Sequence, residues 1–181
     1  MKRLVLLLLL VPCLLLGGCG HNDAAGRFAP FSEELAARSD LCFTAALRAE
    51  YPDRSAAFTL RYEDCGPGAV VTVLEPEEIR GVSVHVNGAE SSLGYDAIVL
   101  DTGALDRYGL SPASAPVRLV QALREGHLES AWEEEGLTVW EIILDDGQSV
   151  CVWLSEALVP VRAELISDGR VTVFCEIGDW S

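Results

Sequence analysis

The chain has 181 residues, with 13 Lys or Arg against 28 Asp or Glu and a formal net charge of −15. Lys2 and Arg3 fall in a leader that we expect to be removed, which leaves 11 basic and 28 acidic residues, a net charge of −17. This charge argues against nucleic-acid binding, because a phosphate backbone is held by clustered cations. Half of the residues are hydrophobic and strand-like runs recur, which excludes a disordered acidic tail.

The N-terminus has the features of an export leader. A basic start precedes an apolar stretch, Leu4 to Leu16, that is too short to span a bilayer as a helix. The stretch ends in Leu16-Gly17-Gly18-Cys19, which resembles the lipobox of bacterial lipoproteins. The resemblance implies that residues 1–18 are a signal peptide and that Cys19 receives a diacylglyceryl group and becomes the new N-terminus. An ordinary secretory leader cut elsewhere is the alternative.

The anchor predicts where the protein lies and how its domain begins. Lipidated Cys19 would hold an exported protein on the outer face of the cytoplasmic membrane, or in an outer membrane if the source has one. Residues 19–30 then form the lipidated cysteine and a flexible tether, and residues 31–181 form one domain. A short helix is predicted to begin at Ser32, with acidic residues in its first turn.

Two strands with a half-buried period follow, from Leu41 to Tyr51 and from Ala56 to Cys65. A two-residue turn at Asp53-Arg54 would place all apolar residues on one face and Cys42 directly opposite Cys65. Directly opposed positions lie within disulfide reach, so the pattern predicts a Cys42–Cys65 disulfide. Two unpaired thiols are the alternative.

Strand signals continue to the C-terminus, interrupted by one convincing helix. That helix has Pro116 in its first turn and an apolar stripe of Leu119, Val120 and Leu123 that stops at Gly126. The further strand signals cover residues 69–74, 81–86, 93–100, 127–132, 137–144, 149–154, 159–166 and 171–177. The sequence therefore predicts a mainly β (α+β) fold. We expect a single curved antiparallel sheet of about ten strands, forming an open half-barrel covered by one or two short helices.

Two more cysteines, Cys151 and Cys175, fall on the last strands. A three-residue turn at residues 167–169 aligns Cys175 with Val161, and a plain meander would keep the two sulfurs about 10 Å apart. Either the topology is not a plain meander there, or both residues are buried thiols. There is no Cys-x-x-Cys and the three histidines are scattered, so neither a zinc site nor a thioredoxin-like site is predicted, and we expect no cofactor.

The layout from Phe31 to Trp180 resembles the LolA-like group of lipoprotein carriers and lipid-binding lipoproteins. The resemblance is carried by the lipobox, the paired N-terminal strands, residues 74–81 before a strand at the middle of the sheet, the helix after Ser111-Pro112 and the closing run 147–170. It implies an apolar cavity between sheet and helices, which takes acyl chains in relatives. Seven residues could line such a cavity or could simply fill the core: Phe43, Phe58, Leu60, Val84, Leu119, Val120 and Leu123.

We therefore expect a non-enzymatic, lipid-anchored protein that binds a hydrophobic ligand such as an acyl chain, or an envelope partner. The two functions differ in structure. A carrier keeps a continuous apolar cavity, whereas an interaction module has a packed interior and an exposed apolar patch.

One short motif points to catalysis. Asp101-Thr102-Gly103-Ala104 follows an apolar strand and resembles the D-T-G-A motif of retropepsin-type aspartic proteases, in which two aspartates share one proton. A single copy would require a homodimer, and the apolar-apolar-Gly segment that packs behind the loop in that family is absent from the sequence. A strand that ends in an Asx-type turn is the alternative, so we predict no catalytic residue.

Overall fold

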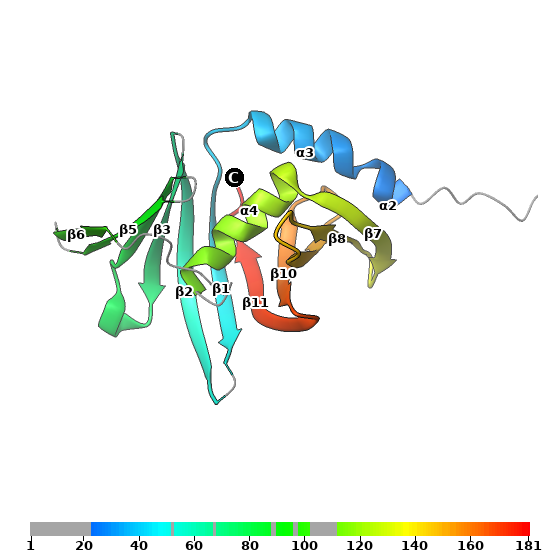
Figure 1. Ribbon diagram of the computed structural model, residues 1–181. Coiled ribbons are helices and arrows are strands. Elements are labelled where there is room, and N and C mark those ends of the chain that lie inside the picture. The colour runs from blue at the N-terminus through cyan, green and yellow to red at the C-terminus, as the bar shows by residue number, and fades with distance from the viewer. Residues whose placement is uncertain (1–22, 52, 67, 88–89, 96–97, 102–111) are drawn as a thin grey trace, which may run out of the picture.

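The computed structural model of the chain describes residues 23–51, 53–66, 68–87, 90–95, 98–101 and 112–181 (Figure 1). The strands are β1 Cys42–Glu50, β2 Ser55–Cys65, β3 Gly68–Glu75, β4 Ser83–Asn87, β5 Glu90–Tyr95, β6 Ile98–Asp101, β7 His127–Glu134, β8 Leu137–Ile143, β9 Ser149–Leu154, β10 Pro160–Ser167 and β11 Arg170–Gly178. The helical elements are α2 Asp23–Gly26, α3 Phe28–Ala37, η1 Glu77–Ile79, η2 Pro112–Ser114 and α4 Ala115–Glu125.

All eleven strands of the described residues form one antiparallel sheet, in the order β6-β5-β4-β3-β2-β1-β11-β10-β9-β8-β7. The strands β1 to β6 form a meander from the centre of the sheet to one edge, and β7 to β11 form a meander from the other edge back to the centre, where β11 pairs with β1. Between β6 and β7 the chain therefore crosses from one edge of the sheet to the other. Helix α4 lies on that crossing, and the sheet curves around it (Figure 1). The prediction of an open, curved antiparallel sheet over short helices is confirmed.

Helix α4 fills the concave face of the sheet. Pro116 lies in its first turn, and its stripe of Leu119 and Leu123 is fully buried. The helix ends at Gly126, where a Cβ atom would collide with the side chain of Ile142 on β8. The helix stops where the sequence predicts, and the structure adds that its end packs closely on the sheet.

The N-terminal helices pack on Trp140, a fully buried residue of β8. Its indole N–H donates a hydrogen bond of 2.8 Å to the Ala24 carbonyl, and the rings of Phe28 and Phe31 lie edge-on to it at 5.2 Å. The tether predicted over residues 19–30 is therefore wrong for residues 23–30, and α3 begins at Phe28 rather than at Ser32. Burial of Ala24 and Phe28 outweighs the local signals for a tether.

The register of the first hairpin differs from the prediction by two residues. Glu50 pairs with Ser55 across a four-residue loop, so Cys42 lies opposite Glu63 and not Cys65. A shift of two keeps every side chain on its predicted face but moves the cysteines to diagonal positions, whose separation of about 7–8 Å exceeds disulfide reach. The predicted Cys42–Cys65 disulfide is not formed, and both thiols are free.

The last hairpin turns in two residues instead of three. Asp168 and Gly169 both have positive φ, which suits a tight hairpin turn. A bulge between Leu165 and Ile166 shifts the register by one more residue, so Cys175 lies opposite Ala163. Strands β9, β10 and β11 form a plain meander. Cys175 belongs to the main core, whereas Cys151 belongs to a separate cluster with Val139 and Trp153. Both are buried thiols, which was one of the two alternatives.

Two smaller expectations also change. The run predicted as one strand over residues 93–100 divides between β5 and β6. Strand β4, expected at the middle of the sheet, is the third strand from the β6 edge. In the part of the chain that the structure describes, no helix is long and apolar enough to cross a membrane.

Candidate functional site

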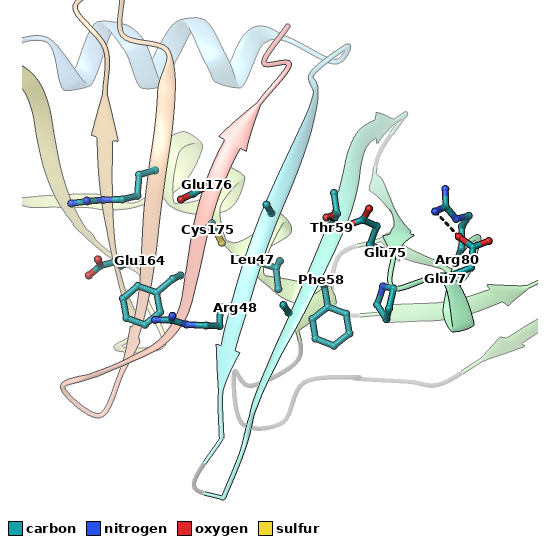
Figure 2. Close-up of a pocket in the computed structure, with 15 residues that line it drawn as sticks. Leu47, Arg48, Phe58, Thr59, Glu75, Glu77, Arg80, Glu164, Cys175 and Glu176 are labelled. Carbon is teal, nitrogen blue, oxygen red and sulfur yellow. Dashed lines mark hydrogen bonds and ion pairs between the residues drawn. The ribbon is translucent and has the colours of Figure 1, made fainter.

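The outer face of the sheet, on the side away from α4, carries a groove of about 790 Å³ (Figure 2). We call it the outer groove. Strands β2, β1, β11 and β10 contribute to its lining, and the segment from the end of β3 through η1 lines it on one side. Its aromatic and charged lining residues are Phe58, Phe174, Arg48, Arg80, Arg162, Glu75, Glu77, Glu164 and Glu176.

The strand register gathers the residues at the centre of the outer groove. On β1, exposed Arg48 follows buried Leu47, and it lies opposite Phe174 of β11. Phe174 in turn lies opposite Glu164 of β10, and Arg162 lies opposite Glu176. Alternation along three adjacent strands therefore places these five side chains together on the outer face.

Two arginines of the outer groove lie over aromatic rings. The guanidinium carbon of Arg48 is 4.9 Å from the centroid of the Phe174 ring, and that of Arg162 is 3.8 Å from the centroid of the Trp153 ring. The Trp153 indole N–H donates a hydrogen bond of 3.1 Å to Glu134. This bond and the burial of Trp153 fix the ring that supports Arg162.

The arginines differ in their ion pairs. Arg48 Nε is 2.7 Å from Glu50, and Arg80 is 2.6 Å from Glu77. The side chain of Arg162 forms no ion pair or hydrogen bond with any described residue, and its Nε is buried without a partner. A guanidinium carries five N–H donors that bind carboxylates in a fixed geometry. Arg162 is therefore stacked on a ring, and its terminal N–H groups are not used by any described residue.

Two of the four glutamates that line the outer groove have no partner among the described residues. Glu164 and Glu176 form no ion pair or hydrogen bond within the described residues, whereas Glu75 accepts one from Thr59 at 3.1 Å. Figure 2 shows Glu164 near Arg48, whereas Glu176 lies farther along β11, where its backbone is opposite that of Arg162. The outer groove thus presents free charges of both signs next to aromatic surface, a combination typical of polypeptide recognition.

Cys151 lies under this region but is poorly suited to chemistry. Burial raises the pKa of its thiol to about 11, and the carboxylates of Glu141 and Glu164 add to the shift. The thiolate is the nucleophilic form, so Cys151 is a packing residue here.

The residues predicted to line a cavity are mostly packed core. Phe43, Leu60, Leu119, Val120 and Leu123 belong to one cluster, each 3% exposed or less. The Phe43 ring lies 4.9 Å from the rings of both Tyr62 and Trp180. Val84 is buried but does not belong to that cluster. Phe58 is half-buried, packs against the cluster and also lines the outer groove.

Val120 also lines a second cleft, of about 610 Å³, between the helices and β2–β4. The cleft contains an ion pair in which Arg124 of α4 donates to both Asp64 oxygens, at 2.7 and 3.2 Å. Arg124 also donates to the carbonyls of Leu35 and Arg38, which ties the end of α3 to α4. This cleft has a charged lining and a structural role, so it is a poor acyl-chain site.

The ionisation of this network follows its geometry. Burial acts to raise the pKa of Asp64, but hydrogen bonds from Arg124, the Tyr62 hydroxyl and the Leu41 N–H outweigh it and hold the pKa below its ordinary value. Burial raises the pKa of Tyr62, and its bond to Asp64 adds to the shift. Asp64 is therefore a carboxylate with all of its partners supplied by the fold.

The other predicted sites add no chemistry to the groove. Asp101 is the last residue of β6 and its backbone lies opposite Ser92, while residues 102–104 of the motif lie outside the described residues, as does Cys19. The described ranges contain no group of three or more His, Cys, Asp or Glu placed to hold a metal ion.

Sequence reasoning missed the outer groove. The signal lay in β9 and β10, where Trp153, Arg162 and Glu164 alternate with apolar residues and so belong to the outer face. The available hint was an arginine inside a strand of a domain that has only 11 basic residues after the leader. What could not be predicted is that Arg162 lies on Trp153, because that depends on the shifted register at a bulge in β10.

We compared the sequence and the fold with those of known proteins. No family model and no curated protein matches the sequence. Among solved structures, similar ones include a LolA superfamily protein from Nitrosomonas europaea (13% identity, 85% of this chain and 91% of that chain, TM-score 0.45). A second is a putative outer membrane lipoprotein-sorting protein domain from Vibrio parahaemolyticus (12% identity, 87% of this chain and 91% of that chain, TM-score 0.48). A third is LprF from Mycobacterium bovis (10% identity, 90% of this chain and 95% of that chain, TM-score 0.39).

Proposed function

We propose that this protein is an exported lipoprotein, anchored through Cys19, that docks a second envelope protein in the outer groove. The observation that carries the proposal is Arg162, a ring-supported guanidinium without a partner, beside the unpaired carboxylates Glu164 and Glu176. A charged group held in place without a partner costs stability, so its retention is understandable if a ligand supplies the partner.

The packing of the interior favours protein docking over acyl-chain transport. An acyl chain between sheet and α4 would have to displace Phe43, Leu119 and Leu123, which are fully buried. Dense cores resist such displacement, because each lost contact and each expanded cavity costs free energy. The outer groove needs no such opening.

The groove also indicates the chemistry of the partner. Arg162 would bind a carboxylate, Glu164 and Glu176 would bind Lys or Arg, and the ring of Phe174 would contact an apolar side chain. An extended segment with both charge signs around an apolar residue satisfies all three. Since the mature chain carries −17, a partner with a basic surface would also be steered toward it.

The test is site-specific photocrosslinking in the source cells. A photoreactive amino acid at Ala57, an exposed residue that lines the groove, should give one discrete adduct whose partner is identified by mass spectrometry. The same amino acid at exposed Glu33 on α3 serves as the position control. The adduct should disappear in Arg162→Glu and persist in Arg80→Glu, which reverses a charge at the rim that is already paired.

The affinity of the purified partner for each variant is then measured. We expect Arg162→Glu to weaken its binding at least tenfold, since reversal of a desolvated charge costs much more than reversal at a rim. Equal adducts at residues 57 and 33, or unchanged affinity in Arg162→Glu, would refute docking in the outer groove. Native mass spectrometry of the mature protein tests the carrier alternative, because a stoichiometric lipid in the spectrum would show that the interior opens.

A further inference from the structure

A third concave region, a groove of about 430 Å³, lies at the end of the molecule where the chain enters the fold. It runs between the N-terminal helices and the loop from β9 to β10, with Trp180 at its side. Besides Leu35 and Trp180, its uncharged lining residues are Gly26, Pro30, Phe31, Ala157, Leu158 and Val159, and we call these six the anchor-end surface. Gly26, Pro30, Ala157 and Val159 are exposed, with Val159 at 37%.

The length of chain before α2 limits how far this surface can lie from the anchor. Only three residues separate Cys19 from Asp23, the first residue of α2, so the two are at most about 14 Å apart even when fully extended. Helix α2 is fixed to the body by the bond from Trp140 to Ala24. A lipid on Cys19 therefore brings this end of the domain to the bilayer.

The charges of the groove suit that position. Its charged lining residues are Arg27, Arg38 and Glu34, whereas the mature chain as a whole has 28 acidic and 11 basic residues. Arg27 is paired with Glu133 and Arg38 with Asp40. The strong negative charge that repels the rest of the protein from anionic headgroups is thus absent from this groove.

We infer that the anchor-end surface lies on the membrane, with its exposed apolar residues in contact with the lipid interface. This inference rests on the lipid anchor of the proposed function and names the membrane-facing side of the domain. The contact area is small, but a tether this short keeps the surface at high local concentration near the lipid, so a weak contact suffices to orient the protein. The outer groove, on the other side of the sheet from α4, then remains accessible to a partner.

Fluorescence quenching in phosphatidylcholine vesicles tests the orientation. The lipidated protein with Cys42 and Cys65 replaced by Ser carries an environment-sensitive dye on Val159→Cys, and the vesicles contain a spin-labelled lipid as quencher. The control dye sits on Ser55→Cys at the start of β2, next to the β1–β2 loop, which lies at the opposite end of the molecule from α3 (Figure 1). Ala157→Cys is a second reporter in case substitution at residue 159 disturbs the loop.

We expect at least twofold stronger quenching at residues 159 and 157 than at residue 55. Equal quenching at both ends, or none at residues 157 and 159, would overturn the inference and leave the docking proposal intact. Intact mass of the same sample reports the acyl groups on Cys19, and their absence would remove the anchor on which both proposals depend. Loss of the difference when the dye-labelled domain lacks its lipid would confirm that the tether creates the contact.

Discussion

The two faces of the curved sheet use the same strands for different purposes. The inner face is packed: along β1, every second residue from Phe43 to Ala49 is buried against the core. The outer face of the same strand carries Arg48, which stacks on Phe174 at the outer groove. Alternation along a strand can thus separate stability from recognition, because side chains on one face can change without moving those on the other.

Two tryptophans on the adjacent strands β8 and β9 also differ in role according to the face on which they lie. Trp140 on β8 faces inward, is fully buried and holds α2 through its indole N–H. Trp153 on β9 faces outward, bonds to Glu134 and supports Arg162 with its ring. The first holds the fold together, and the second positions a charge for a partner.

The largest expected difference between the faces is in thiol reactivity. Cys175 on the inner face is 2% exposed, and burial raises the pKa of its thiol to about 12, whereas Cys65 is exposed. At pH 8 the thiolate fraction of Cys175 should be about a thousandfold below that of an ordinary thiol, before access is considered. Timed alkylation followed by peptide mass spectrometry should therefore label Cys65 first and Cys175 only on unfolding. A mature protein 2 Da light, with Cys42 and Cys65 both unreactive, would instead show the disulfide that the sequence predicts.

The next largest effect should come from Trp140→Ala. Loss of a fully buried indole, its hydrogen bond to Ala24 and its contacts with two phenylalanines should cost about 4 kcal/mol of unfolding free energy. The matched control is Trp132→Ala on β7, a half-buried residue at the outer face, for which we expect about 1 kcal/mol. Urea denaturation measures both. Similar losses in the two variants would contradict the division of roles between the faces.

Sequence reasoning recovers the fold because its signals are periodic. The stripe of Leu119 and Leu123, the stop at Gly126 and the bounds of β9 follow from patterns that the structure reproduces. The pairing of β1 with β11 is not visible in the sequence, because it joins residues more than 120 positions apart. The length of the β1–β2 loop was also not predicted. The loop is two residues longer than expected, which is enough to separate Cys42 from Cys65.

The candidate site was less predictable than the fold for a physical reason. Burial of Phe43 or Leu60 follows from hydrophobicity alone, but whether buried residues enclose a cavity depends on how side chains from distant strands fit. The outer groove depends on register at a bulge and on a charge without a partner, and neither leaves a periodic trace. Similarly, the helical start at residue 23 depends on Trp140, which is over a hundred residues away.

A smaller effect is expected at the ion pair between Asp64 and Arg124, whose side chains are 4% and 19% exposed. Asp64→Asn should lower the unfolding free energy by about 2–3 kcal/mol, because it leaves a mostly buried guanidinium without its charge partner. The native pKa of Asp64 lies below its ordinary value, so this stabilisation is present above about pH 4 and is lost as the pH falls through the native pKa. The stability profile of Asp64→Asn should therefore be flatter below pH 4.

Asp40→Asn is the matched control for this pair, since Asp40 is 80% exposed and pairs with Arg38 at the surface. We expect a change below about 1 kcal/mol there, as for most exposed ion pairs. If both variants lose the same stability, the pair in the cleft is no more than a surface contact.

The smallest effect on stability is expected from Arg162→Gln. Its guanidinium contributes a ring contact and no ion pair within the described residues, so removal should cost less than about 1 kcal/mol. Arg48→Gln removes a ring contact and an ion pair with Glu50, and it serves as the control on the same face. Equilibrium unfolding of both, beside partner binding by Arg162→Gln, separates the two uses of the sheet. If Arg162→Gln changes stability little but weakens partner binding, the charge of Arg162 serves recognition. A large loss of stability in Arg162→Gln would instead make Arg162 part of the fold and remove the main support for docking in the outer groove.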